Sequence, residues 1–247
     1  MNPQPVKEEI IARYSSKFAK DYLSYELENE AAFFRLQRLA LKDARFDKLE
    51  KKLFLRAANG KPASEQPSVL DAGCATGALL SDLKSRGWRV TGVEISPSAE
   101  FAQKERNLDV RNLPLEENNF SSCSFDVVLA SHIIEHLNDP RSFLTEARRI
   151  LRDCGYIFIT TPNISGFQAR IYGSLWRSAI FDHLYLFSKR TLINLLEDTG
   201  FTVESCHTWG GLASGMVPSW IKKPADFLAK CLGIGDVMII RARKTQN

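Results

Sequence analysis

Two acidic residues, Asp71 and Glu94, each follow a short apolar run and lie 23 positions apart. Between them, the turn Ala-Gly-Cys-Ala-Thr-Gly at 72–77 carries Gly73 and Gly77, which let the backbone approach a ligand where a Cβ would collide. In an open α/β sheet, a carboxylate at the position of Glu94 faces the two hydroxyls of a ribose. The spacing therefore predicts a strand, turn, helix and strand built around a nucleotide-like ligand.

The turn also distinguishes between classes of cofactor. A dinucleotide fingerprint needs glycines at 73, 75 and 78, but Ala75 and Ala78 occupy two of these positions, which disfavours a nicotinamide-dependent oxidoreductase. A carboxylate at Asp71 would repel a phosphate and attract an ammonium group, such as that of S-adenosylmethionine. The segment resembles motif I of the class I S-adenosylmethionine-dependent methyltransferases, usually acid-x-Gly-x-Gly-x-Gly, with Ala75 in place of the middle glycine.

The resemblance extends along the chain. Ser124–Ser131 is similar to the fourth strand of these methyltransferases, and Ile150–Ile159 is similar to their helix, turn and fifth strand. Gly200-Phe201 and Gly235–Ile240 match the start of the sixth strand and the last strand. Over residues 68–243, the resemblance implies a Rossmann-like, doubly wound α/β sheet of seven mostly parallel strands with an antiparallel last strand.

The resemblance also implies which residues hold S-adenosyl-L-methionine. Ligands of open α/β sheets bind beyond the carboxyl ends of the strands. The cofactor-binding residues expected at these ends and in motif I are Asp71, Gly73, Ala75, Gly77, Glu94, Ile95, Asn112, Leu113 and Ser131. Asn112 and Leu113 belong to this set because family members contact the adenine just after the third strand.

The segment Ser131–Leu137 contains the pattern His-x-x-Glu-His. A zinc protease needs this inverted motif on a continuous helix, whereas here it lies between an expected strand and Asn138-Asp139-Pro140, which disfavours a protease. A similar Glu-His pair follows the fourth strand in methyltransferases that resemble those of ubiquinone biosynthesis. The resemblance implies a catalytic group of His136, Glu135 and His132, with His136 as a general base suited to neutral pH.

A metal-assisted alternative stays open. Some relatives, including small-RNA 2′-O-methyltransferases, hold a divalent ion with acid-x-x-Glu-His and a later histidine, and Asp182–Ser188 resembles the segment with that histidine. The ligands would be His132, Glu135, His136 and His183, and the ion would lower the pKa of the substrate oxygen. Because His132 replaces the expected acid, the histidines are expected to bind substrate or hydrogen-bond loops without a metal.

The elements that position these residues follow from hydrophobic patterning. From residue 68 onward, short apolar runs alternate with helical patterns, which predicts a parallel sheet with right-handed crossovers. The expected strands are 68–71, 89–94, 109–112, 125–131, 155–160, 201–208 and 236–243. The expected helices are 77–87, 97–106, 140–151, 188–199 and 224–232, with Gly87 and Gly200 as natural helix stops.

Residues 1–60 are expected to form an N-terminal helical cap, ahead of a methyltransferase domain at 61–247. Two helices are predicted between residues 6 and 58, each with an apolar stripe. The stripes consist of Tyr14, Phe18 and Tyr22 in the first helix and Phe46, Leu49 and Leu53 in the second. The aromatic stripe has two interpretations, core packing and closure of the cofactor pocket.

Aromatic residues and arginines alternate in the segment 164–187, which is expected to form a lid insertion near the pocket. They would grip a flat or anionic substrate by stacking and bidentate contacts, or the segment would be a surface helix packed on the cap. The expected substrate-binding residues are Tyr14, Asn163, Trp176 and His183.

Composition limits the partners. The 247 residues include 33 Lys and Arg against 29 Asp and Glu, and a net charge of +4 disfavours nucleic acid. No run approaches the ~18 consecutive apolar residues of a membrane span, and the first residues lack the layout of a secretory signal. Five widely spaced cysteines, an odd number, fit a reducing cytoplasm. The oligomeric state is not indicated.

The predicted function is transfer of a methyl group from S-adenosylmethionine to a small-molecule acceptor. Oxygen is the expected acceptor atom, because no Asn/Asp-Pro-Pro-Tyr signature for the amino groups of bases is present. Two alternatives stay open: a methyltransferase of RNA or another macromolecule, and a methyltransferase-like binding module without turnover.

Overall fold

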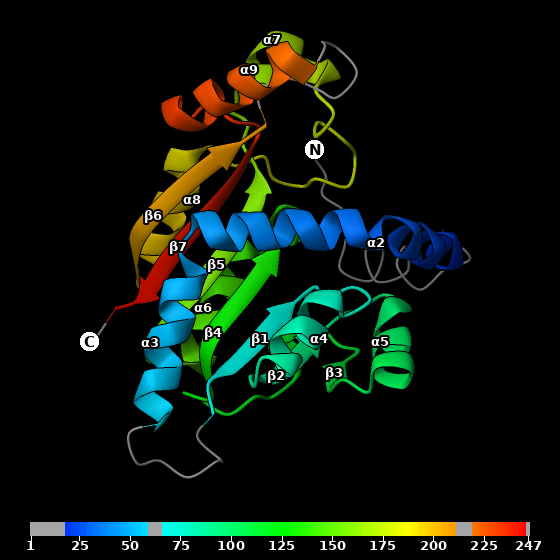
Figure 1. Ribbon diagram of the computed structural model, residues 1–247, viewed down its shortest axis with the longest axis vertical. Helices are drawn as coiled ribbons and strands as arrows, with labels where there is room; N and C mark the ends of the chain where they lie inside the picture. The colour runs from blue at the N-terminus through cyan, green and yellow to red at the C-terminus, as the bar shows by residue number, and fades with distance from the viewer. Residues whose placement is uncertain (1–17, 59–65, 211–218, 246–247) are drawn as a thin grey trace.

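The computed structural model describes residues 18–58, 66–210 and 219–245. Within these ranges, seven strands form one sheet in the order β3-β2-β1-β4-β5-β7-β6 (Figure 1). The strands are β1 (Ser68–Ala72), β2 (Arg89–Val93), β3 (Val110–Arg111), β4 (Phe125–Ser131), β5 (Leu151–Pro162), β6 (Phe201–Trp209) and β7 (Val237–Lys244). Only β7 runs antiparallel to its neighbours. The predicted Rossmann-like sheet with an antiparallel last strand is confirmed.

Helices cover both faces of this sheet. The α-helices of the described ranges are α2 (Phe18–Asp43), α3 (Phe46–Ala58), α4 (Ala78–Ser85), α5 (Ser98–Arg106), α6 (Pro140–Ile150), α7 (Phe167–Tyr172), α8 (Lys189–Asp198) and α9 (Ser219–Leu232). The described ranges also contain three short 3-10 helices, η2 (Leu115–Glu117), η3 (Ile134–His136) and η4 (Gly173–Leu175).

The two faces of the sheet carry separate apolar cores, because successive side chains of a strand point to opposite sides. Leu70 packs on one side with Phe143 of α6 and Leu192 of α8. Its neighbour Val69 packs on the other side with Phe46 of α3 and with residues of α2 and α4. The N-terminal helices therefore belong to the same three-layered body as the sheet.

Two element boundaries differ from the prediction by more than two residues. β5 begins at Leu151, inside the expected helix, and pairs with β4 there before a register shift. The extra residues 152–155 form a bulge, which sequence patterning does not separate from a turn. α9 begins at Ser219 rather than at 224, so placing a helix start at Pro224 was wrong; the proline lies inside the helix.

The second predicted N-terminal helix is confirmed as α3, which buries Phe46, Leu49 and Leu53. Tyr14 lies outside the described residues. Within the described ranges, none of the helices combines the length and the apolar character that crossing a lipid bilayer requires. All five cysteines are free thiols.

Candidate functional site

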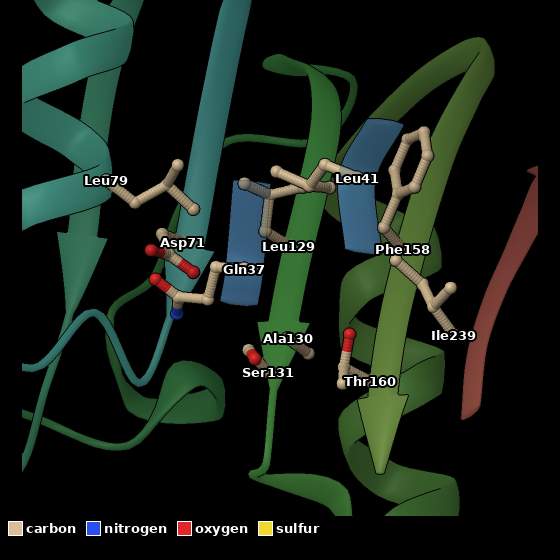
Figure 2. A pocket seen from close by; sticks show the side chains of 10 residues that line it. All are labelled: Gln37, Leu41, Asp71, Leu79, Leu129, Ala130, Ser131, Phe158, Thr160 and Ile239. Atoms are coloured by element: carbon tan, nitrogen blue, oxygen red, sulfur yellow. The ribbon is translucent and has the colours of Figure 1, made fainter. Parts of the chain in front are cut away.

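The carboxyl edge of the parallel strands carries a small cavity beside Asp71 (Figure 2). Its volume is about 20 Å³. The lining residues come from β1, β4, β5, β7, α2 and α4 and are Gln37, Leu41, Asp71, Leu79, Leu129, Ala130, Ser131, Phe158, Thr160 and Ile239. Asp71 and Ser131, two of the expected cofactor-binding residues, are thereby brought together.

Asp71 is a buried and incompletely paired carboxylate. Only 1% of the residue is exposed, and its Oδ1 atom has no hydrogen-bond partner among the described residues. Burial raises the pKa of Asp71 well above its usual value, and the negative charge of Glu94 adds to this effect. A buried acceptor without a donor is costly in a folded protein. Asp71 therefore fits a ligand that carries an ammonium group.

Glu94 follows β2 directly, and its side chain contacts the motif I turn. Its Oε2 atom accepts a hydrogen bond from the backbone N–H of Ala75 at 3.0 Å, and its Oε1 atom accepts one from Ser96 N–H at 2.8 Å. Each carboxylate oxygen can accept more than one hydrogen bond, so this arrangement leaves capacity for hydroxyl donors. Contact between Glu94 and a ribose remains a prediction.

The motif I turn depends on left-handed backbone conformations. Gly73 and Gly77 have φ angles of +72° and +80°, and Ala75 adopts +48°. A Cβ at Gly73 would lie 2.1 Å from the side chain of Ile133, and one at Gly77 would lie 2.5 Å from that of Leu108. Backbone conformation and packing therefore require these glycines, independently of any ligand.

The other expected cofactor residues surround the Glu94 loop. Asn112 donates from its amide to the carbonyl oxygens of Glu94 and Ser96, at 2.8 and 3.3 Å. It therefore holds the loop in place, while Leu113 is exposed and Ile95 is half-buried. Contacts of Asn112, Leu113 and Ile95 with the adenine or ribose remain predictions.

The expected catalytic residues follow β4 and cluster around a buried glutamate. Glu135 is 1% exposed, and its two carboxylate oxygens contact His132 Nδ1 at 3.0 Å and accept from Thr161 Oγ1 at 2.9 Å. Burial opposes ionisation, but the hydrogen bond from His132 and the charges of His132 and His136 hold the pKa of Glu135 below its usual value. His132 has a left-handed φ of +56°, a strained conformation typical of functional sites.

The rings of His136 and His183 pack edge to face, with centroids 4.7 Å apart. The Nδ1 atom of His136 lies 2.9 Å from the carbonyl oxygen of Asp182, and that of His183 lies 2.8 Å from the carbonyl oxygen of Ser178. Because a carbonyl oxygen only accepts, both Nδ1 atoms carry the hydrogen and both Nε2 atoms keep a lone pair. Burial lowers the pKa of His136, and His183 acts in the same direction.

One group with metal-ligating atoms is found among the described residues. Ligand atoms of Glu135, His136 and His183 all lie within 4.8 Å of one another. His132, the fourth member of the expected metal set, is not part of this group and instead contacts Glu135. The two imidazoles and one carboxylate fit a divalent transition metal, since each histidine donates its other N–H to a carbonyl oxygen.

Two expected substrate-binding residues are buried. Asn163 is 1% exposed; its amide donates to Gly235 O at 2.8 Å and accepts from Ser165 N–H at 3.1 Å. A substrate contact would compete with these structural hydrogen bonds. Trp176 is 3% exposed, and its indole N–H has no partner among the described residues. Substrate contacts of both residues remain predictions.

Sequence reasoning missed the residues that α2 contributes to the site. Gln37 and Leu41 of α2 line the cavity, and Figure 2 shows the amide of Gln37 beside the carboxylate of Asp71. Thr161 of β5 orients Glu135. The end of the expected fifth strand pointed toward Thr161, but no local pattern indicates which helix covers an active site.

Comparisons with known proteins identify the family. A model described as "Methyltransferase domain" matches residues 36–206. The ubiquinone biosynthesis O-methyltransferase of Rattus norvegicus is 34% identical over 42% of this chain and 33% of that protein. A probable S-adenosylmethionine-dependent methyltransferase of Mycolicibacterium smegmatis is 32% identical over 55% of this chain and 52% of that protein. The chain thus spans about half or less of the length of these curated relatives.

The fold is found in solved structures as well. A SAM-dependent methyltransferase of Thermotoga maritima, described as a possible histamine N-methyltransferase, superposes with a TM-score of 0.58 at 22% identity. The match covers 90% of this chain and 97% of that one. With the buried Asp71 at the carboxyl edge, these findings confirm the resemblance and the cofactor class expected from motif I. The chain belongs to the methyltransferase domain family, whose cofactor is S-adenosylmethionine.

Proposed function

We propose that this chain transfers a methyl group from S-adenosylmethionine to an oxygen atom of a small-molecule acceptor. The observation that carries the proposal is the position of His136, whose Nδ1–H is held by Asp182 O so that Nε2 keeps its lone pair. The bound cofactor supplies a methyl group on a positively charged sulfur, which is already electrophilic. The protein's part is to orient the acceptor, exclude water and remove a proton.

Each residue has a role that its surroundings support. Asp71 binds the cofactor's ammonium group, which would pair its orphaned oxygen. Glu94 accepts from the ribose hydroxyls. His136 takes the proton of the acceptor hydroxyl at Nε2, and the ionised Glu135 stabilises the imidazolium that results. His132 and Thr161 keep Glu135 in place.

The choice of oxygen and of a small molecule rests on relatives. Several similar proteins are named ubiquinone biosynthesis O-methyltransferase, among them proteins of Cereibacter sphaeroides and Caulobacter vibrioides. Because the matched regions cover about half of those proteins, their acceptor is not transferred to this chain. Hydroxyl groups on small aromatic molecules are the substrate class to test first.

Replacing His136 tests the role of the general base. We expect His136→Gln to lower kcat by about 100-fold or more, the usual contribution of a positioned base, with unchanged affinity for S-adenosylhomocysteine. His207→Gln is the matched control, because His207 lies on β6 away from this cluster. Initial rates with labelled cofactor and a panel of phenols, amines and RNA give the comparison. Full activity of His136→Gln would exclude the base, and transfer only to RNA would favour the macromolecular alternative.

A metal-assisted version of the same reaction is the second candidate, favoured by the group of Glu135, His136 and His183. A divalent ion held there would lower the pKa of the acceptor hydroxyl and orient it, so that His136 would be a ligand rather than a base. Chelation separates the two versions. If metal takes part, a chelator abolishes activity, added Mn²⁺ or Zn²⁺ restores it, and His183→Gln prevents the restoration. Activity that persists in the chelator supports the metal-free base.

A further inference from the structure

Helix α2 lies over the cofactor edge of the sheet. Figure 1 shows it crossing the sheet near the carboxyl ends of β1 and β4 and continuing toward α5. Gln37 and Leu41 form the part of the cavity wall that α2 contributes (Figure 2). The cavity beneath is about 20 Å³, whereas pockets for ligands of drug size measure ~300–1,000 Å³. A nucleoside-sized ligand therefore needs α2 to move before it reaches the buried Asp71.

Two glutamates on the inner side of α2 fasten it to the cofactor-binding loops. Glu26 is 7% exposed and accepts a hydrogen bond from the hydroxyl of Ser98, the first residue of α5. One turn later, Glu30 accepts from Thr76 Oγ1 at 2.6 Å and forms an ion pair with Arg106 at 2.5 Å. Thr76 belongs to the motif I turn, so α2 contacts the cofactor loop directly.

The two ends of α2 are held by different forces. Ala40, Leu41 and Ala44, at and just beyond its C-terminal end, are buried in the core with α3. The described part of the N-terminal half exposes Tyr25 and Leu27, and Glu26 and Glu30 give it polar contacts with α5 and the motif I turn. The contacts of Glu30 are only partly buried, and such polar contacts break and re-form more readily than a packed apolar anchor.

We propose that α2 is the cover of the cofactor site, anchored at its C-terminal end, and that Glu26 and Glu30 are the latch that sets the rate of cofactor exchange. This inference rests on S-adenosylmethionine binding as proposed above. Glu30 and Glu26 are positioning residues, because they act on the cofactor through Thr76, Ser98 and α2. The latch also gives a role to the two inward-facing acids of this helix.

The test is the dissociation rate of S-adenosylhomocysteine, measured by stopped-flow displacement. We expect Glu30→Gln to raise this rate about tenfold, because the ion pair with Arg106 is lost. Glu28→Gln is the matched control, since Glu28 is an exposed acid on the same helix. In hydrogen exchange, backbone amides of α2 are expected to exchange faster in Glu30→Gln and slower in the wild type with bound S-adenosylhomocysteine.

Reversing the charges separates a latch from a merely structural role. Arg106→Gln should accelerate dissociation as Glu30→Gln does, and the double change Glu30→Arg with Arg106→Glu should restore the slow rate. Equal rates in wild type, Glu30→Gln and Arg106→Gln would overturn the latch. If the wild type binds neither S-adenosylmethionine nor S-adenosylhomocysteine, the proposed function fails instead. If it binds S-adenosylhomocysteine and neither variant changes the dissociation rate, only the latch is excluded.

Discussion

At the scale of single residues, the sequence locates the acids and the structure reveals their state. Asp71 and Glu94 were predictable because each terminates an apolar strand pattern. That Glu94 is satisfied by two backbone donors while Asp71 keeps an orphaned oxygen could not be predicted, because it depends on loops folded back from elsewhere in the chain. The difference matters, because a cationic ligand would pair the unsatisfied buried oxygen of Asp71 and bind more tightly as a result.

Replacing Asp71 should stabilise the unliganded protein while weakening the binding of S-adenosylmethionine. Its pKa is raised in the folded state, so its ionisation opposes folding increasingly as the pH rises above the ordinary carboxyl value of 3.8. We expect Asp71→Asn to increase the unfolding free energy at neutral pH by about 1 to 3 kcal/mol, the cost of a buried unsatisfied group. The gain should shrink toward acid pH.

Denaturant unfolding at several pH values, with calorimetry for cofactor affinity, measures both effects of Asp71→Asn. Pairing with the cofactor's ammonium group would lower the pKa of Asp71 again, so binding should release protons near that pKa. Titrations in two buffers of different ionisation enthalpy detect this release. A variant that is less stable at neutral pH and binds as tightly as the wild type would contradict the assignment of Asp71.

At the scale of elements, the sequence predicted the strands closely, but it did not predict which helix covers the site. β4 matches its expected bounds at both ends, because an alternation bounded by turn residues defines it locally. The proposed catalytic cluster consists of three separate segments, the η3 turn, β5 and the stretch before α8, which only the tertiary fold brings together. The position of α2 is a tertiary property of the same kind: its acids look like ordinary solvent-facing charges in the sequence.

The motif I turn between β1 and α4 makes an element-scale prediction. Ala75 stands where the family pattern has glycine and adopts a φ of +48°, which costs an L-residue ~1–2 kcal/mol. We expect Ala75→Gly to raise the unfolding free energy by about 1 kcal/mol without changing cofactor affinity. Ala31→Gly in the exposed part of α2 is the control, expected to lower it by about 1 kcal/mol. If thermal unfolding shows Ala75→Gly to be less stable than Ala31→Gly, the backbone of Ala75 is not strained.

At the scale of the whole molecule, the parallel strands bring two groups of candidate site residues to one edge. Asp71 near the end of β1 and Glu94 just after β2 are proposed to bind the cofactor, and the histidine cluster that follows β4 and β5 is proposed to bind the acceptor. The N-terminal helices complete this arrangement, because α3 packs on the sheet and α2 lies over its cofactor edge. The sequence predicted the sheet and a helical cap, but the site depends on how the cap lies over the sheet.

The central claim is that this edge binds S-adenosylmethionine through two carboxylates. Calorimetric titration of the wild type and of Glu94→Ala with S-adenosylmethionine tests it most directly. The wild type should bind, and Glu94→Ala should bind more weakly by about 1.5 to 3 kcal/mol, the range for hydrogen bonds to a charged group. Absence of binding to the wild type, or equal affinity in both proteins, would contradict the account.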